Sequence, residues 1–223
     1  MKRVFVASVC GLALSAAIGA AEAADLGRGY PPVARAPIYA PAYYNWTGFY
    51  LGINGGGGWG RSTWDAVGTF DISGGLIGGT IGYNWQFGQA VVGVEGDIDW
   101  SGIKGTTTIL CPLGCETRNS WLATVRGRLG YAFDRFLPFL TGGLAVGNIR
   151  ATTPLLPGGT ITTAGWTVGA GVEFAVLSNV TVKAEYLYVD LGNFNCGLNC
   201  GLAPTGNVSF HTNVVRAGLN VRF

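Results

Sequence analysis

From Trp46 onward, apolar and polar residues alternate with a period of two in short segments of the chain. We count eight: residues 46–59, 75–87, 90–101, 119–132, 137–149, 163–176, 180–191 and 209–223. Successive side chains of a β-strand point to opposite faces, so each segment is typical of a strand with one apolar face. After residue 23, no stretch approaches the roughly 18 apolar residues that a spanning helix needs. The pattern therefore predicts an all-β chain.

The connectors between these segments alternate strictly in length. The short ones cover residues 88–89, 133–136 and 177–179, and the long ones cover 60–74, 102–118, 150–162 and 192–208. Bacterial outer-membrane barrels have short periplasmic turns and longer extracellular loops. We therefore expect an eight-stranded antiparallel transmembrane β-barrel of up-and-down topology over residues 46–223.

The charged residues of the segments share one face of the predicted strands. There are five of each sign: Glu95, Asp97, Asp99, Glu173, Glu185, Arg126, Arg128, Lys183, Arg216 and Arg222. The other face of these stretches carries no charge. A soluble, lipocalin-like barrel would show the same alternation with its apolar face inside, so a further signal must decide.

Aromatic residues supply that signal, because they gather near both ends of the apolar face. Those at the loop side are Trp59, Trp100, Trp121, Trp166, Tyr186 and Tyr188, and those at the turn side are Trp85, Tyr131, Phe174 and Phe223. Such girdles mark the two membrane interfaces of outer-membrane barrels. Glycines on the charged face leave room for ion pairs in a narrow cylinder. We therefore expect lipid outside and a charge network in the lumen.

The first 45 residues differ from the rest of the chain. Lys2 and Arg3 precede an apolar run over residues 4–19, and Ala21-Glu22-Ala23 follows as a cleavage site, which predicts a signal peptide over residues 1–23. The alternative is an uncleaved anchor, but the run is short for a spanning helix. Prolines recur through residues 24–45, which we expect to form an extended periplasmic linker.

Composition agrees with an exported membrane protein. The chain of 223 residues is 48% hydrophobic and 12% charged, and its mean hydropathy is +0.34. Charged residues are usually about a quarter of a soluble chain. A formal net charge of +2 provides no basic field, so nucleic acid is not an expected partner.

Export also changes the interpretation of the cysteines, because the exported compartment is oxidising. The predicted mature chain keeps Cys111, Cys115, Cys196 and Cys200, as two C-x3-C pairs in the second and fourth long connectors. We expect disulfides, with the two local pairs as the natural connectivity. A zinc site with four thiolates is the alternative, although structural zinc sites more often use C-x2-C.

Two motifs resemble a known family. The sequence Tyr-Asn-Trp-Thr-Gly-Phe-Tyr-Leu-Gly at residues 44–52, followed by a glycine run and Trp59-Gly60, is similar to the opening strand of the outer-membrane immunogenic proteins. These are small porin-like barrels, distantly similar to the membrane domain of OmpA. Residues 215–223 resemble the family's last strand, and Phe223 resembles the signal that the outer-membrane insertion machinery reads. The resemblance implies a surface antigen of a Gram-negative outer membrane.

A structural and surface role in the envelope is the leading hypothesis for function. Its expected partners are outer-membrane lipid, lipopolysaccharide and the insertion machinery, and the sequence leaves open whether barrels associate as homo-oligomers. A small passive pore is the nearest alternative. Eight strands enclose little more than their own side chains, and five cations facing five anions could plug the lumen.

Two further hypotheses concern ligands and catalysis. Surface binding of haem or a host receptor is one alternative, and haem is suggested by the resemblance, since some relatives are described as haem-binding. Haem would rely on His211, the only histidine, which the strand phase places outward. Catalysis would need a base held by a third group, and Ser209 two residues from His211 is a commonplace pair in a strand. The carboxylates of Glu95, Asp97 and Asp99 could hold a metal, but ion pairing with Arg126 and Arg128 is the simpler interpretation. We expect no enzyme, cofactor or metal.

Overall fold

The computed structural model describes residues 43–64, 68–108, 115–153, 156–195 and 207–223. Contacts divide the chain into two units, Met1–Pro41 and Ala42–Phe223. The predicted signal peptide, the linker up to residue 42, and Cys111, Cys196 and Cys200 lie outside the described residues. Cys115 is described only as the first residue of a strand. The disulfides therefore stay a prediction.

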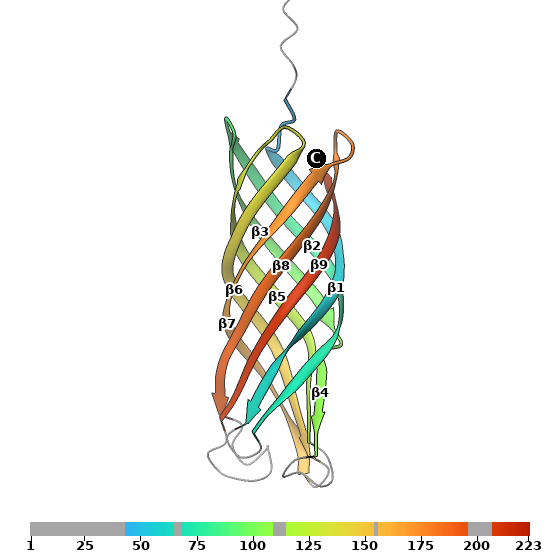
Figure 1. The fold of residues 1–223 in the computed structure, drawn as a ribbon, viewed down its shortest axis with the longest axis vertical. Helices are drawn as coiled ribbons and strands as arrows, with labels where there is room; N and C mark the ends of the chain where they lie inside the picture. Colours follow the sequence, from blue (N-terminus) through green and yellow to red (C-terminus); the bar gives the residue numbers. More distant parts are fainter. Residues whose placement is uncertain (1–42, 65–67, 109–114, 154–155, 196–206) are drawn as a thin grey trace, which may run out of the picture. The chain divides into compact units, whose positions relative to one another are not determined.

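The second unit is a closed antiparallel β-barrel (Figure 1). Its strands are β1 (Gly48–Trp64), β2 (Gly68–Phe87), β3 (Ala90–Ser101), β4 (Lys104–Thr107), β5 (Cys115–Tyr131), β6 (Phe136–Thr153), β7 (Leu156–Ala175), β8 (Val180–Asn195) and β9 (Asn207–Arg222). Strand β1 pairs with both β2 and β9, which closes the sheet and leaves no free edge. Strand β4 continues β3, since both pair with β2 and β5. Strands β3 and β4 together act as one barrel strand, so the nine segments form an eight-stranded antiparallel barrel, and the predicted fold class is confirmed.

Short turns join the strands at one end of the barrel, which we call the turn side. The C-terminus lies at this end, at the top of Figure 1, and the opposite end is called the loop side. Phe87 pairs with Ala90 across the two-residue turn, and Gly88 has a φ of 62°. A glycine suits the first position of such a hairpin loop because a positive φ is needed there. No helix among the described residues is long and apolar enough to cross a membrane.

The strands reach further toward the loop side than the sequence predicts. Strands β1 and β2 pair as far as Trp64 and Gly68, although residues 60–74 were expected to form a long connector. The expected connectors at 102–118, 150–162 and 192–208 are likewise occupied in part by β4 to β9. Alternation fades in these stretches, because a strand end outside the lipid needs no apolar outer face. Backbone pairing continues there without that signal.

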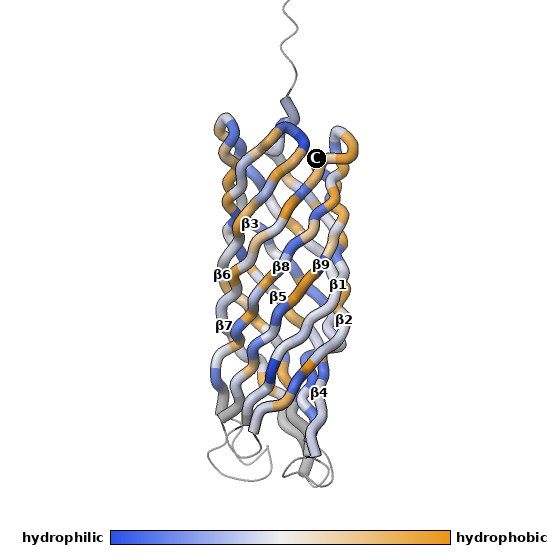
Figure 2. Tube along the Cα trace, viewed as in Figure 1, coloured by the Kyte–Doolittle hydropathy of each residue, from blue (hydrophilic) through white to orange (hydrophobic). Residues whose placement is uncertain are grey.

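The outer face of the barrel is apolar over its middle, as the strand phase predicts. Hydrophobic and hydrophilic residues alternate along the strands in Figure 2. Trp59, Trp100 and Trp166 are exposed on this face toward the loop side, and Trp85, Phe174 and Phe223 toward the turn side. Aromatic girdles of this kind mark the two lipid interfaces of outer-membrane barrels.

Candidate functional site in the barrel interior

The interior of the barrel changes character from one end to the other, and β8 shows this within a single strand. From the turn side, its inward residues are Thr181, Lys183, Glu185, Leu187, Val189 and Leu191, all buried. A charged middle layer therefore passes into an apolar layer toward the loop side. A third layer, centred on two residues before β1, closes the turn side.

The turn-side layer centres on Trp46, which is buried and precedes β1. Its indole Nε1 donates a hydrogen bond to the carbonyl of Asp134 at 2.9 Å, and its backbone N–H donates to the side chain of Gln86 at 2.6 Å. Tyr44 packs against it edge to face, at 4.8 Å between ring centroids. The other members of this cluster are Val91, Ala132, Leu137 and Ala175.

These contacts correct two predictions about the start of the barrel. Trp46 was expected to begin the first strand, but that strand begins at Gly48 and Trp46 caps the interior instead. Tyr44 was expected in an extended linker, yet it is buried and the guanidinium of Arg222 lies 4.5 Å from its ring centroid. The backbone N–H of Tyr44 is held by the carboxylate of Asp134 at 2.8 Å. The ring of Tyr44 has large apolar faces, so its burial against other side chains is more favourable than its exposure to water.

Arg126 occupies the centre of the charged layer. Its Nη2 lies 2.5 Å from a carboxylate oxygen of Glu95 and 2.6 Å from one of Asp97, and its Nη1 lies 2.9 Å from Glu185. Its Nε donates to the hydroxyl of Thr124 at 3.0 Å. Arg126 comes from β5, Glu95 and Asp97 come from the neighbouring strand β3, and Glu185 comes from β8 across the lumen.

Arg216 of β9 is a second hub. It contacts Asp97 at 2.8 Å, Asp99 at 2.6 Å and Glu185 at 2.8 Å. Gly56, its register partner on β1, permits this packing, since a Cβ there would collide with the backbone of Val215 and Arg216. Lys183 completes this part of the network by contacting Glu95 at 2.8 Å and Glu185 at 3.1 Å.

Arg128 extends the network toward the turn side. It pairs with Glu173 at 2.6 Å, and its guanidinium lies 4.1 Å from the ring centroid of Phe139. Glu173 also accepts hydrogen bonds from Thr181 at 2.5 Å and Asn220 at 2.9 Å. The buried carboxylate is therefore both paired and hydrogen-bonded, which is the condition for placing a charge away from water.

Nine of the ten predicted lumen charges thus lie buried together inside the barrel. Arg222 does not join them: it lies against Tyr44 at the turn side and donates to the carbonyl of Ser178 at 2.9 Å. The carboxylates that come closest are Glu95, Asp97 and Glu185, with oxygens within 4.8 Å of one another, in place of the expected Glu95–Asp97–Asp99 trio. Arg126 bonds all three and so occupies the place where a cation would sit.

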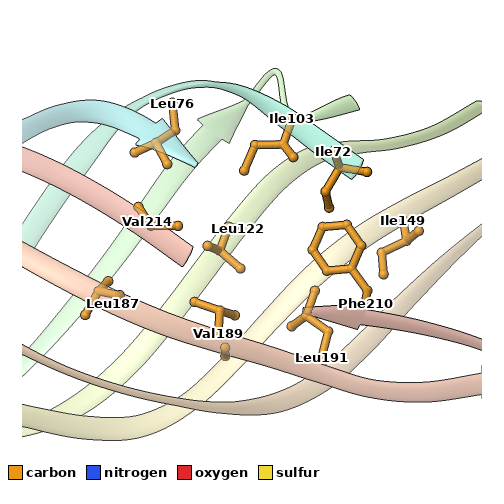
Figure 3. Packing of buried hydrophobic residues seen from close by; sticks show 11 residues of the cluster. Ile72, Leu76, Ile103, Leu122, Ile149, Leu187, Val189, Leu191, Phe210 and Val214 are labelled. Carbon is orange, nitrogen blue, oxygen red and sulfur yellow. The ribbon is translucent and has the colours of Figure 1, made fainter. Parts of the chain in front are cut away.

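The loop-side layer is an apolar core that sequence reasoning missed. Eleven buried residues make it: Ile72, Leu76, Ile103, Leu122, Ala145, Ile149, Leu187, Val189, Leu191, Phe210 and Val214. In Figure 3 the ring of Phe210 lies among Ile72, Ile149 and Leu191. The signal was present in the sequence, because Leu187, Val189 and Leu191 are in phase with Lys183 and Glu185.

The two residues considered for ligand or catalytic chemistry lie at the loop end of β9. The imidazole Nδ1 of His211 is 3.4 Å from a carboxylate oxygen of Asp190, and the side chain is 41% exposed. The hydroxyl of Ser209 donates to the side-chain oxygen of Asn193 instead of to His211. The pair therefore lacks the hydrogen bond that would activate a serine.

Comparison with known proteins places the chain among outer-membrane barrels. Residues 10–223 match the family model described as outer membrane protein beta-barrel domain. The chain is 37% identical to the 31 kDa outer-membrane immunogenic protein of Brucella melitensis biotype 1, in an alignment that covers all of both chains. It is 36% identical to the 22 kDa outer membrane protein of Rhizobium leguminosarum bv. viciae, over 80% of this chain and 79% of that one. The crystal structure of Neisserial surface protein A aligns at a TM-score of 0.47 and 20% identity, over 79% of this chain and 98% of that chain.

Proposed function

The chain belongs to the outer-membrane immunogenic proteins, a family of outer-membrane β-barrels, and we propose that it serves as a closed structural barrel that displays its four loop-side connectors at the cell surface. Family membership places the chain in the Gram-negative outer membrane. The proposal concerns what the barrel does there.

One observation carries this proposal: three packed layers succeed one another along the lumen. The Trp46 cap fills the turn side, the ion pairs around Arg126 and Arg216 fill the middle, and the core around Phe210 fills the loop side. An eight-stranded barrel is just wide enough for side chains to fill, whereas porins with about 16 strands leave an aqueous channel. A filled lumen supports an envelope role over transport.

The outer surface supports the proposed lipid partners and the proposed route of assembly. Val215, Leu219, Val221 and Phe223 alternate along the last strand and are all exposed on the outer face. This apolar face would meet lipid in the folded barrel, and the same alternating residues would be read by the insertion machinery before the barrel closes. Truncation of Phe223 should slow membrane insertion while leaving refolding in detergent intact.

Conductance of the refolded mature chain in planar bilayers tests the closed-barrel proposal. A heat-modifiable shift on a gel first establishes that the barrel has folded. We expect folded protein to be electrically silent. Steady openings whose conductance changes in Arg126→Gln or Glu95→Gln would instead support a small passive pore and overturn the proposal.

We also propose that the barrel acts without catalysis or haem. The geometry of Ser209, His211 and Asp190 supports this, because the serine hydroxyl is bonded elsewhere and the histidine is held beside a carboxylate. A titration with haem checks the second point. The absorption spectrum of haem should be the same with wild-type protein and with His211→Ala.

A further inference from the structure

Two rows of directly paired residues carry most of the outward charges that the structure describes at the loop side of the barrel. The first row runs across β8, β9, β1 and β2, through Asp190, His211, Arg61 and Asp71 in that order. Each basic residue of this row lies beside an acidic one, with 3.4 Å between His211 and Asp190 and 3.7 Å between Arg61 and Asp71. Each carboxylate of this row therefore has a basic partner within the row.

The second row runs across β4, β5 and β6 and carries cations alone. Lys104 pairs in register with Arg118, and Arg118 pairs with Arg150. All three side chains are exposed. Directly opposed residues on one face have Cβ atoms about 5 Å apart, and like charges in that position are destabilising. A folded barrel keeps such an arrangement more readily when an anion outside the chain lies against it.

The acidic residues near this cationic row do not neutralise it. Asp71 lies on the neighbouring strand β2 and is engaged by Arg61. Glu116 lies two residues from Arg118 along β5, on the side of the row nearer the loops. Within the part of the chain that the structure describes, neither carboxylate lies within 4.0 Å of a nitrogen of Lys104, Arg118 or Arg150. The flanking register partners are neutral: Ser73 beside Lys104, and Thr160 beside Arg150.

The height of the cationic row identifies the kind of anion. Trp100 and Trp121 face each other in register, at the loop-side girdle where lipid tails give way to headgroups. Lys104 lies four residues beyond Trp100, which is about 13 Å along the strand and less along the tilted barrel axis. The row therefore lies at the level of the outer-leaflet headgroups.

We propose that Lys104, Arg118 and Arg150 form a binding site for the phosphate groups of lipid A, the phosphorylated glycolipid of the outer leaflet. Guanidinium groups bind phosphate through paired hydrogen bonds, and a lysine adds a mobile point charge. Ser73 and Thr160 supply hydroxyls on either side for the sugar. The inference rests on the proposed orientation, with the loop side facing outward.

Native mass spectrometry of the folded barrel in detergent micelles tests this site. The lipids supplied are lipid A with two phosphates, its monophosphoryl form and phosphatidylglycerol, and inorganic phosphate serves as the soluble anion. We expect bisphosphorylated lipid A to bind best, and Arg118→Gln to weaken that binding about tenfold because it removes the centre of the row. Arg61→Gln is the matched control, since it removes an outward arginine at a similar height from the self-neutralised row. It should leave binding within about twofold.

Each alternative result overturns the assignment. Equal binding by Arg118→Gln and wild type would show that the row is not the site. Equal affinity for phosphatidylglycerol would show a general anionic surface, and displacement by inorganic phosphate at equal concentration would show a site for the free ion. A heat-modifiable gel shift on every variant separates loss of the site from loss of the fold. Conductance, which tests the closed barrel, is independent of all these results.

Discussion

Arg216 Nη1 lies 2.6 Å from Oδ2 of Asp99, although the two residues are 117 positions apart in the sequence. Arg216 is on β9 and Asp99 is on β3, with β1 and β2 between these strands. The bond therefore passes through the interior and joins two strands that share no backbone hydrogen bonds. Tertiary ion pairs thus brace the barrel across its lumen.

Arg216→Leu should lower the free energy of unfolding by about 3–5 kcal/mol. The substitution leaves Asp97, Asp99 and Glu185 with fewer cationic partners, and an uncompensated buried charge is costly. Urea-induced unfolding of the refolded barrel in lipid vesicles, followed by tryptophan fluorescence, measures the loss.

The matched control for this substitution is Arg61→Leu. Arg61 pairs with Asp71 at 3.7 Å, but the two side chains are 73% and 91% exposed. An exposed pair contributes between zero and about 1 kcal/mol. If the two leucine variants unfold at the same urea concentration, the interior network does not stabilise the barrel as described.

The pair formed by Arg128 and Glu173 should show strong energetic coupling. Glu173 receives hydrogen bonds from Thr181 and Asn220 as well as from Arg128, so each single substitution strands buried polar groups. In a double-mutant cycle with Arg128→Met and Glu173→Gln, the double variant should be more stable than the sum of the single losses predicts, by about 1–3 kcal/mol. Additive losses would mean that the two residues act independently, and the 2.6 Å contact would then have no energetic weight.

Two adjacent valines on β9 separate the interior from the lipid face. Val214 is 1% exposed and lies in the loop-side core, whereas Val215 is 48% exposed on the outer face. Val214→Ala should cost about 1.5–3 kcal/mol, because two lost methyl groups leave a cavity among packed side chains. Val215→Ala should cost less than about 1 kcal/mol, because lipid tails fill the space. Unfolding in vesicles measures both, and equal losses would contradict the closed, packed lumen.

The sequence predicts the barrel strands and their two faces well, because the alternation of apolar and polar residues is a local property. Lys183 and Glu185 alternate with Val182 and Ala184, and the structure gives each the face that its phase requires. The same alternation could not predict that Asp99 meets Arg216 across the lumen, because that contact depends on the width of the closed barrel and on which strands lie opposite.

Other features escaped prediction for different physical reasons. The apolar loop-side core was in phase with the lumen charges, but a polar interior was assumed for the whole length of the barrel. The role of Trp46 was hidden because the residue continues the alternating pattern of the first segment, although β1 begins only at Gly48. A bulge near Ser120 also shifts the register between β5 and β6, so that Asn119 and Leu122 both face inward. Such an irregularity breaks the period of two on which the sequence reasoning depends.

Tyr44 should make the stability of the barrel sensitive to alkaline pH. Burial raises the pKa of its phenol. The positive charges of Arg222 and Arg135 oppose that rise in pKa, and the negative charge of Glu173 adds to it. The folded state therefore favours the neutral phenol, and the unfolded chain loses its proton first as the pH rises through about 10. The contribution of Tyr44 to stability is intact at pH 8 and is lost above about pH 10.

Tyr44→Phe isolates this effect from the titration of the other tyrosines. The Tyr44 hydroxyl is buried, and no described residue hydrogen-bonds to it, so its removal should leave the free energy of unfolding at pH 8 unchanged or slightly higher. Between pH 8 and pH 11, wild type should lose more stability than Tyr44→Phe. Urea unfolding of both proteins at the two pH values measures this difference. Parallel losses, or marked destabilisation of Tyr44→Phe at pH 8, would show that the phenol is hydrated and that the turn-side cap is looser than its contacts with Trp46 indicate.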